Sequence, residues 1–322
     1  MNSEVPSLLS IMPDSKRALV EKDAEDFLAV ALKEAEITTS GLRIVEEKSI
    51  HRGLPSIICI EECLSSGVCK ELRRAMDASP HLTFWNANGR EDESAKRFRD
   101  ADTVEVKSSA LASLLWDNIK HAVGHWEIEI GGNEEEDPRW ERELPGTWRA
   151  TGVNDDFLFA KYPSGGHFAP HTDGRTIHDF NCRSFYSIIL YLNSVPLDEG
   201  AGTNFYPADT VNSLFLDSSS QWTSDKSKVQ YEIEAKIGKA LIFSQELVHE
   251  GVPPKDCHVK YIIRTDVMFS RVPPICDSDN DVEAYEMHRR GQEYAENGQL
   301  ELGLPLMKKA MKLASAELQK YL

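Results

Sequence analysis

The stretch "DFLFAKYPSGGHFAPHTDGR", residues 156–175, joins an apolar run to a turn that holds a histidine and an aspartate one residue apart. Further short apolar runs follow until about residue 270, separated by Gly, Pro, Asn, Asp and Ser. No long helical pattern lies between these runs, which read "FYSIILYLN", "GTNFYP", "VNSLFL", "VQYEIEAKIGKALIF" and "KYIIRTDVMF". This spacing predicts an antiparallel sandwich or barrel rather than βαβ units.

The pair at positions 171 and 173 has the spacing of two metal ligands. On an extended segment, His171 and Asp173 point to the same side, with their Cα atoms about 6.5 Å apart. A third ligand is available in His249, which follows an apolar strand in "ALIFSQELVHEGVPP". Two histidines and one carboxylate on one face suit non-haem Fe(II), whereas structural zinc takes a closed shell of four ligands. Taken alone, an HxD pair also fits a chance surface turn.

The composition narrows the class of protein. The chain has 322 residues, 41% of them hydrophobic, which is enough for one large domain with an appendage. A formal net charge of −17 opposes binding to nucleic acid or to an anionic membrane surface. The sequence has no signal-peptide pattern and no run of about 18 apolar residues, so we expect a soluble cytoplasmic or nuclear protein. Six cysteines without a CxxC pair indicate reduced thiols.

Helical periodicity precedes the strand-rich middle. Amphipathic spacing predicts helices over 15–36 and 108–123. In "LPSIICIEECLSSGVCKELRRAM", residues 54–76, a buried strand leads into a further helix. The Gly-, Pro- and acid-rich stretch 131–146 predicts a long surface loop.

The chain becomes helical again after Pro273 and Pro274, with two helices expected at about 281–297 and 300–321. This pair is similar to one tetratricopeptide unit, which cannot bury its own face, so we expect it to dock on the body, on a partner or on a second copy. We therefore divide the chain into an N-terminal helical segment (1–40), a β-rich domain with supporting helices (41–272, core 148–270) and a C-terminal helical pair (279–322).

Several motifs in one order resemble the iron(II)/2-oxoglutarate-dependent dioxygenase superfamily, in particular its prolyl 4-hydroxylase-type catalytic domain. They are "WRATGVNDDFLFAKYPSGGHFAPHTDGR", "SFYSIILYLN", "GAGTNFYP", "GKALIFSQELVHEG" and "KYIIRTDVMF", across about 148–270. The resemblance implies an α+β fold with a mainly β core, a distorted double-stranded β-helix (jelly-roll or cupin-like barrel) flanked by N-terminal helices and a C-terminal helical hairpin.

The resemblance also implies roles for individual residues. His171, Asp173 and His249 match the iron ligands and hence the catalytic centre, and Lys260 matches the cation that binds the distal carboxylate of 2-oxoglutarate. Tyr162, Tyr191 and Thr203 match residues that line the same pocket.

Arg264 is a departure from the family pattern, because a smaller residue is common at its position. It lies four residues beyond Lys260, so on a straight strand both side chains face inward and either cation can hold the carboxylate. We favour Lys260, and the alternative for Arg264 is a salt bridge with Asp266 or another acid.

Three further residues are expected near the substrate entrance. Arg175 follows the HTDG turn, with solvent exposure as the alternative. Arg99, in "FRDAD", and Trp148, before the first core strand, are the others, with a strand lead-in and core packing as their respective alternatives.

The activity that the resemblance implies is hydroxylation of an unactivated C–H bond, coupled to decarboxylation of 2-oxoglutarate to succinate and CO₂. Fe(II), 2-oxoglutarate and O₂ are the implied cofactors, with L-ascorbate as an optional reductant. A protein or peptidyl side chain such as proline is the first expectation for the substrate. The alternatives are a small-molecule oxygenase, acting on an amino acid or a natural-product intermediate, and a catalytically silent binding or scaffold module. The negative charge opposes oxidative demethylation of nucleic acid.

Overall fold

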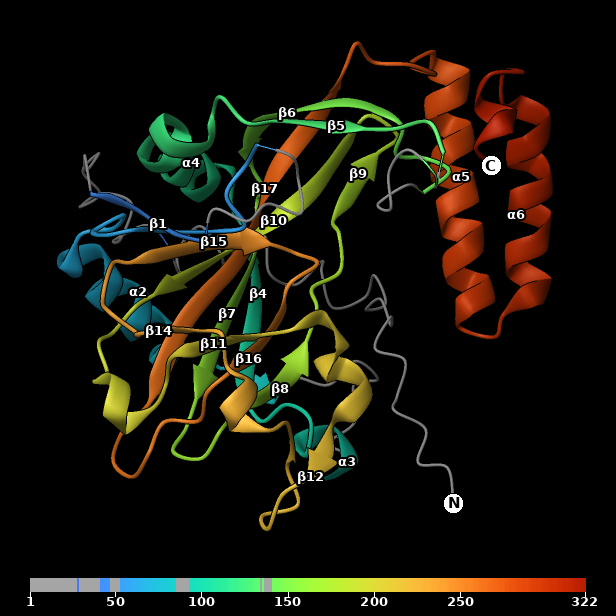
Figure 1. The fold of residues 1–322 in the computed structure, drawn as a ribbon. Coiled ribbons are helices and arrows are strands. Elements are labelled where there is room, and N and C mark those ends of the chain that lie inside the picture. The colour runs from blue at the N-terminus through green and yellow to red at the C-terminus, as the bar shows by residue number, and fades with distance from the viewer. Residues whose placement is uncertain (1–27, 29–40, 47–52, 85–92, 134, 136–140) are drawn as a thin grey trace.

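The computed structural model of the chain describes residues 28, 41–46, 53–84, 93–133, 135 and 141–322. In these residues every pair of named strands is antiparallel, as the sequence predicts. The fold is thus mixed α and β with a large antiparallel sheet content, which is consistent with a double-stranded β-helix (Figure 1).

The strands form one large sheet, one small sheet and a separate pair. The large sheet follows the order β1 (Leu42–Glu46), β2 (Ile57–Ile60), β15 (Ala240–Ser244), β10 (Cys182–Tyr191), β17 (Lys260–Val272), β7 (Asp156–Tyr162), β4 (Asp102–Lys107) and β3 (Thr83–Phe84). Branching from it are β5 (Glu127–Ile130), β6 (Gly146–Val153) and β9 (Ile177–Asp179). The small sheet follows the order β14 (Tyr231–Ile233), β11 (Thr203–Tyr206), β16 (Val248–Gly251) and β8 (Phe168–His171), and β12 (Phe215–Leu216) pairs with β13 (Trp222–Thr223).

Alternating side chains of the central strands build two cores. In β2, Ile58 and Ile60 belong to the core that the large sheet shares with α2 (Ser66–Ala78) and α4 (Ser109–Val123). Ile57 and Cys59 point to the opposite side, into the core that includes Phe205 of the small sheet. Because side chains alternate along a strand, β2, β10 and β15 are apolar on both faces, and this explains their nearly continuous hydrophobic sequences.

The helices begin at residues suited to capping. Ser65 accepts a hydrogen bond from the backbone N–H of Val68 at the start of α2, and Ser108 accepts one from that of Leu111 at the start of α4. The predictions of a strand followed by a helix over 54–76, and of a helix near 108–123, are thus confirmed. The remaining short helices are α3 (Glu93–Lys96), η1 (Leu197–Glu199), η2 (Ala208–Ser213), η3 (Lys226–Lys228) and η4 (Leu318–Lys320).

The C-terminal pair consists of α5 (Asp279–Glu296) and α6 (Leu300–Leu313), which stand side by side at one edge of the molecule (Figure 1). They dock on the body through Phe180, whose ring centroid lies 5.2 Å from that of Tyr285 and 5.0 Å from that of Tyr321. The second helix ends before the expected residue 321, because the N–H of Ser315 donates to Oδ1 of Asp281 in α5 at 2.7 Å instead of extending the helix.

Other expectations from the sequence have mixed outcomes. The N-terminal segment 1–40 lies outside the described residues except for Leu28, which is helical and buried. Of the predicted loop 131–146, residues 134 and 136–140 also lie outside them, and the described residues before β6 form neither helix nor strand. All six cysteines are described and free, as expected. Among the described helices, none is long and apolar enough to cross a membrane.

Candidate metal centre

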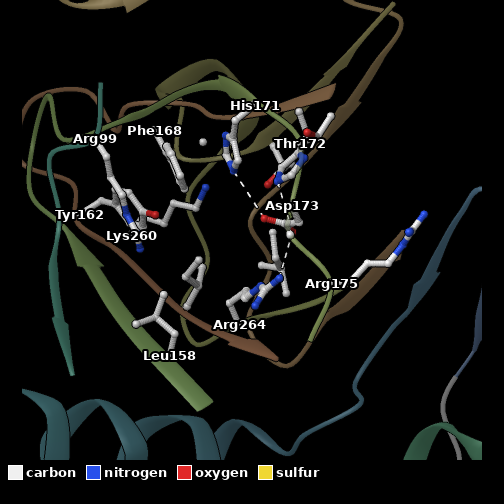
Figure 2. A pocket seen from close by; sticks show the side chains of 16 residues that line it. Arg99, Leu158, Tyr162, Phe168, His171, Thr172, Asp173, Arg175, Lys260 and Arg264 are labelled. Atoms are coloured by element: carbon white, nitrogen blue, oxygen red, sulfur yellow. Dashed lines mark ion pairs between the residues drawn. The ribbon is translucent and has the colours of Figure 1, made fainter. Parts of the chain in front are cut away.

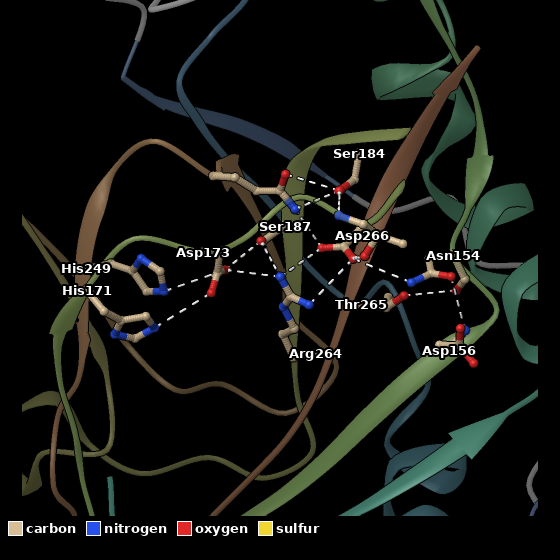
Figure 3. Close-up of polar contacts among 12 residues, drawn as sticks. Asn154, Asp156, His171, Asp173, Ser184, Ser187, His249, Arg264, Thr265 and Asp266 are labelled. Atoms are coloured by element: carbon tan, nitrogen blue, oxygen red, sulfur yellow. Dashed lines mark hydrogen bonds and ion pairs between the residues drawn. The ribbon is translucent and has the colours of Figure 1, made fainter. Parts of the chain in front are cut away.

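His171, Asp173 and His249 meet at one point in the small sheet. β8 pairs with β16 so that His171 lies directly opposite His249, and the loop after β8 brings Asp173 alongside (Figure 3). Nε2 of His171 lies 3.7 Å from Oδ1 of Asp173, and Nε2 of His249 lies 3.8 Å from Oδ2. One ligand atom from each residue falls within 4.8 Å of the others, so the three could hold a metal ion.

Backbone carbonyls determine which ring nitrogen carries the proton in both histidines. Nδ1 of His171 lies 2.7 Å from the carbonyl oxygen of Ala169, and Nδ1 of His249 lies 3.0 Å from that of Leu247. A carbonyl oxygen only accepts, so each Nδ1 is the N–H donor and each Nε2 presents a lone pair. Two lone pairs and a carboxylate therefore converge without a donor between them, which is an arrangement that favours a cation.

Charges around the centre keep the carboxylate ionised and one histidine neutral. Burial opposes ionisation of Asp173, but the Arg264 guanidinium and the two histidines outweigh it and hold the pKa of this carboxyl well below its usual range. Burial, with a contribution from neighbouring His171, lowers the pKa of His249 to about 4. At neutral pH the centre thus has an anionic carboxylate and a neutral His249.

A buried polar network lies behind Asp173 (Figure 3). Asp266 of β17 is fully buried, and its Oδ1 lies 3.1 Å from Nη2 of Arg264. Its carboxylate also accepts hydrogen bonds from Gln245 (2.9 Å) and Thr176 (2.7 Å). The salt bridge between Arg264 and Asp266 is the alternative that the sequence offered for Arg264.

The centre opens into a pocket of about 380 Å³ (Figure 2). Its apolar walls include Leu158, Phe168, Ile189 and Ile262. Of the residues predicted to bind 2-oxoglutarate, Lys260, Arg264, Tyr162 and Thr203 line this pocket. Lys260 lies on the Tyr162 side, whereas Arg264 lies beside Asp173 (Figure 2).

Lys260 is a buried cation with aromatic neighbours. Its ammonium donates a hydrogen bond to the carbonyl of Gly202 at 2.7 Å and lies 5.5 Å and 5.7 Å from the ring centroids of Tyr162 and Tyr191. Burial lowers its pKa to about 7. Tyr191 corrects the prediction, because it does not line the pocket. Its hydroxyl shares a 2.7 Å hydrogen bond with Thr203, which does line the pocket.

The three residues expected at the entrance have different locations. Arg99 is buried against the pocket, stacked over the Phe168 ring at 4.6 Å, and Arg175 lines the pocket with its guanidinium paired to Glu141 and Glu246. Trp148 corrects the prediction, because it is 0% exposed in the core behind the large sheet. Its indole N–H donates to the carbonyl of Leu144 at 2.9 Å, so core packing was the correct alternative.

A second group of potential ligands among the described residues is already engaged elsewhere. Asp155, Asp156 and His178 also come within 4.8 Å of one another. Both aspartates pair with Lys107, at 3.2 Å and 3.7 Å, and Nε2 of His178 contacts Asn154. The group at 171, 173 and 249 is therefore the better candidate.

The family follows from a comparison with family models. Residues 157–265 match the model described as the 2OG-Fe(II) oxygenase superfamily. This part of the chain is a 2OG-Fe(II) oxygenase domain. The match contains all three residues of the candidate centre and both Lys260 and Arg264, so the superfamily expected from the motifs, and a 2-oxoglutarate-dependent dioxygenase enzyme, are confirmed.

Several solved structures are similar to this oxygenase at low identity. A prolyl-4-hydroxylase from Pseudomonas putida is 16% identical with a TM-score of 0.40, and the match covers 76% of this chain and 99% of that chain. A prolyl hydroxylase from Trichoplax adhaerens, in complex with a hypoxia inducible factor peptide fragment, is 16% identical with a TM-score of 0.41 and coverages of 78% and 91%. The viral collagen prolyl hydroxylase from Paramecium Bursaria Chlorella virus-1 is 14% identical with a TM-score of 0.37 and coverages of 67% and 96%. The search of curated proteins found no match.

Sequence reasoning missed three residues around the centre of the oxygenase. Ser187 donates a 2.6 Å hydrogen bond to Oδ2 of Asp173, while Gln245 and Thr176 bind Asp266. The one available signal was a lone serine inside the apolar run "SFYSIILYLN", because a polar residue in a buried strand needs a partner.

Proposed function

We propose that the oxygenase holds one Fe(II) ion between His171, Asp173 and His249, binds 2-oxoglutarate through Lys260, and hydroxylates an unactivated C–H bond of a polypeptide side chain such as proline. The observation that carries the proposal is the convergence of two Nε2 lone pairs and an ionised carboxylate with no donor between them. Two histidines and one carboxylate are the ligand set of non-haem Fe(II) oxygenases, which keep other positions open.

The chemistry that Fe(II) with 2-oxoglutarate and O₂ supplies when bound is a coupled oxidation, in which 2-oxoglutarate becomes succinate and CO₂ while a substrate C–H bond becomes C–OH. In this proposal the chain's own residues bind the metal and 2-oxoglutarate, orient the substrate and exclude water. Leu158, Ile189 and Ile262 give the pocket apolar walls, which shield the reacting groups from solvent.

Lys260, rather than Arg264, is the proposed partner of the distal carboxylate of 2-oxoglutarate. Arg264 already faces two carboxylates, Asp266 at 3.1 Å and Asp173 at 3.7 Å. Lys260 forms no salt bridge among the described residues. Burial lowers its pKa, and the nearby Glu250, which is itself paired with Lys226, offsets this only in part. A buried cation without an anion is costly, so an incoming dicarboxylate is favoured at this position.

A polypeptide substrate is proposed on the shape and polarity of the pocket. A cavity of about 380 Å³ with apolar walls has room for 2-oxoglutarate and one aliphatic side chain near the metal position. The rest of such a substrate would lie outside the pocket, where the chain's net charge of −17 favours basic segments.

The test is succinate release by the purified full chain with Fe(II), 2-oxoglutarate and O₂. Panels of proline-containing peptides are compared with free amino acids and small-molecule pools, and Asp173→Ala serves as the inactive control. We expect iron-dependent succinate formation that at least one peptide stimulates, with a mass increase of one oxygen on that peptide. Stimulation by small molecules alone would show that the substrate is a small molecule and not a polypeptide. Absence of any iron-dependent turnover would overturn the oxygenase reaction in favour of a binding module.

A further inference from the structure

The two oxygens of the Asp173 carboxylate have different surroundings. Oδ1 lies 3.7 Å from Nε2 of His171. Oδ2 accepts the short hydrogen bond from Ser187 and lies 3.7 Å from Nη2 of Arg264 (Figure 3). Each oxygen lies near one histidine, since Oδ2 is also 3.8 Å from Nε2 of His249, but only Oδ2 is in addition held from behind by Ser187 and Arg264.

Arg264 is itself fixed from behind. Its Nη2 also lies 3.1 Å from Oδ1 of Asp266, whose carboxylate accepts further hydrogen bonds from Gln245 and Thr176. Asp266 is 0% exposed and forms part of β17, so its position is determined by the large sheet rather than by a loop. The contacts with Asp266 thus fix the position of the Arg264 guanidinium beside Asp173.

The sharing of Arg264 between two aspartates has an electrostatic consequence. A buried arginine paired with Asp173 alone would largely neutralise this carboxylate and compete with a metal ion for it. With Asp266 as its nearer partner, Arg264 keeps Asp173 ionised and oriented while the negative charge of Asp173 stays available. Two carboxylates and one guanidinium leave a net charge of −1 for the metal.

We propose that Arg264 is a positioning residue for the metal centre, which acts by holding Oδ2 of Asp173 together with Ser187 while Asp266 neutralises the guanidinium. The inference rests on the proposed function, because it takes Asp173 as a metal ligand. It goes beyond that function in assigning Arg264 to the metal ligand rather than to 2-oxoglutarate. Groups that orient a metal ligand from behind commonly contribute 10- to 100-fold in affinity.

Metal affinity of the full chain tests the inference without relying on turnover. Mn(II) replaces Fe(II) because it does not react with O₂, and free Mn(II) is counted by electron paramagnetic resonance. The double variant Arg264→Met with Asp266→Asn removes both charges together, so that the summed charge of the three groups stays at −1. Thr265→Val is the matched control, since it lies between them on β17 and loses one buried hydrogen bond, from its hydroxyl to the carbonyl of Asn154.

We expect the double variant to weaken Mn(II) binding about 10- to 100-fold and the control less than about twofold. The visible spectrum of bound Co(II) should change in the double variant and stay the same in the control. A merely structural role of Arg264 would leave this spectrum unchanged in both. Should the double variant fail to fold, Arg264→Gln decides, because Asp266 then keeps its donors Gln245 and Thr176.

A folded variant that binds Mn(II) as the wild type does and keeps its Co(II) spectrum overturns the positioning role. If the wild-type chain itself binds no Mn(II), the proposed metal centre fails instead. The two failures are therefore distinguishable.

Discussion

At His171 and His249, a carbonyl two residues earlier in the chain binds Nδ1–H and leaves Nε2 for a ligand. The pair of β8 and β16 places both rings side by side, with centroids 4.3 Å apart. Local hydrogen bonds thus fix the orientation of each ring, and the pairing of β8 with β16 fixes the two rings relative to one another. Under the proposed function, metal binding would depend both on the orientation of each ring and on the pairing of β8 with β16.

At Lys260, burial predicts a pH dependence of 2-oxoglutarate binding. The pKa of its ammonium is about 7 in the free protein, and an anion beside it must raise this pKa, so binding takes up a proton above pH 7. We expect the Kd for 2-oxoglutarate to rise roughly 10- to 30-fold between about pH 6.5 and 8.5. Titration calorimetry of the Mn(II)-loaded chain measures this rise.

Two variants at the same position provide the controls. Lys260→Arg keeps its charge over this range, so its Kd should vary little with pH, and Lys260→Met should lose measurable binding. A wild-type Kd that is flat over the range, or one that rises equally in Lys260→Arg, would contradict the role of Lys260.

At the scale of the element, the serine that starts α4 predicts a measurable loss of stability. Ser108 accepts a hydrogen bond from the backbone N–H of Leu111, and Ser108→Ala leaves this donor without its partner. We expect the free energy of unfolding to fall by about 1 kcal/mol in urea titrations. The neighbouring exposed Ser109→Ala is the control, with a change within about 0.5 kcal/mol. Equal effects of the two substitutions would refute the capping role.

The close crossing of α5 and α6 predicts a second effect on stability. A Cβ at Gly303 would lie 2.5 Å from the backbone oxygen of Gly291, so the helices approach too closely for alanine. We expect Gly303→Ala to lower stability by about 1–3 kcal/mol, although alanine is the better helix former, and to leave 2-oxoglutarate binding unchanged. Circular dichroism and calorimetry check both, and increased stability would show that the crossing is loose.

The elements themselves were largely predictable, whereas some of their boundaries and contacts were not. Helical spacing in 54–76 and 108–123 identified α2 and α4, because their buried faces repeat with the helical period. The predicted end of α6 was wrong because the end is determined by a contact between Ser315 and Asp281, which lie far apart in the chain. Trp148 was misplaced for a similar reason, since it packs in the core against Phe185, which lies far along the chain.

At the scale of the whole molecule, the candidate site combines segments that lie far apart in the chain, from Arg99 before β4 to Arg264 of β17. The sequence predicted that His171, Asp173 and His249 would meet, and the structure brings them together. It could not reveal Ser187 or Gln245 as their supports, because such contacts depend on the register of β10 with β15 and β17. The C-terminal helices dock at the far end of β9, through Phe180.

The dependence of global stability on ligands follows from this arrangement. A ligand that binds only the folded chain stabilises it by about 2.7 kcal/mol at a concentration of 100 times its Kd. We expect Mn(II) with 2-oxoglutarate to shift the urea midpoint of the wild-type oxygenase upward, and to leave that of Asp173→Ala unchanged. An equal shift in both proteins would indicate binding elsewhere.

The most direct test of the central claim is anomalous diffraction at the iron edge, from crystals grown without oxygen in the presence of Fe(II) and 2-oxoglutarate. The account predicts one peak in contact with Nε2 of His171, Nε2 of His249 and the Asp173 carboxylate, with the distal carboxylate of 2-oxoglutarate at Lys260. Iron bound at another position, or none between these three side chains, would contradict it.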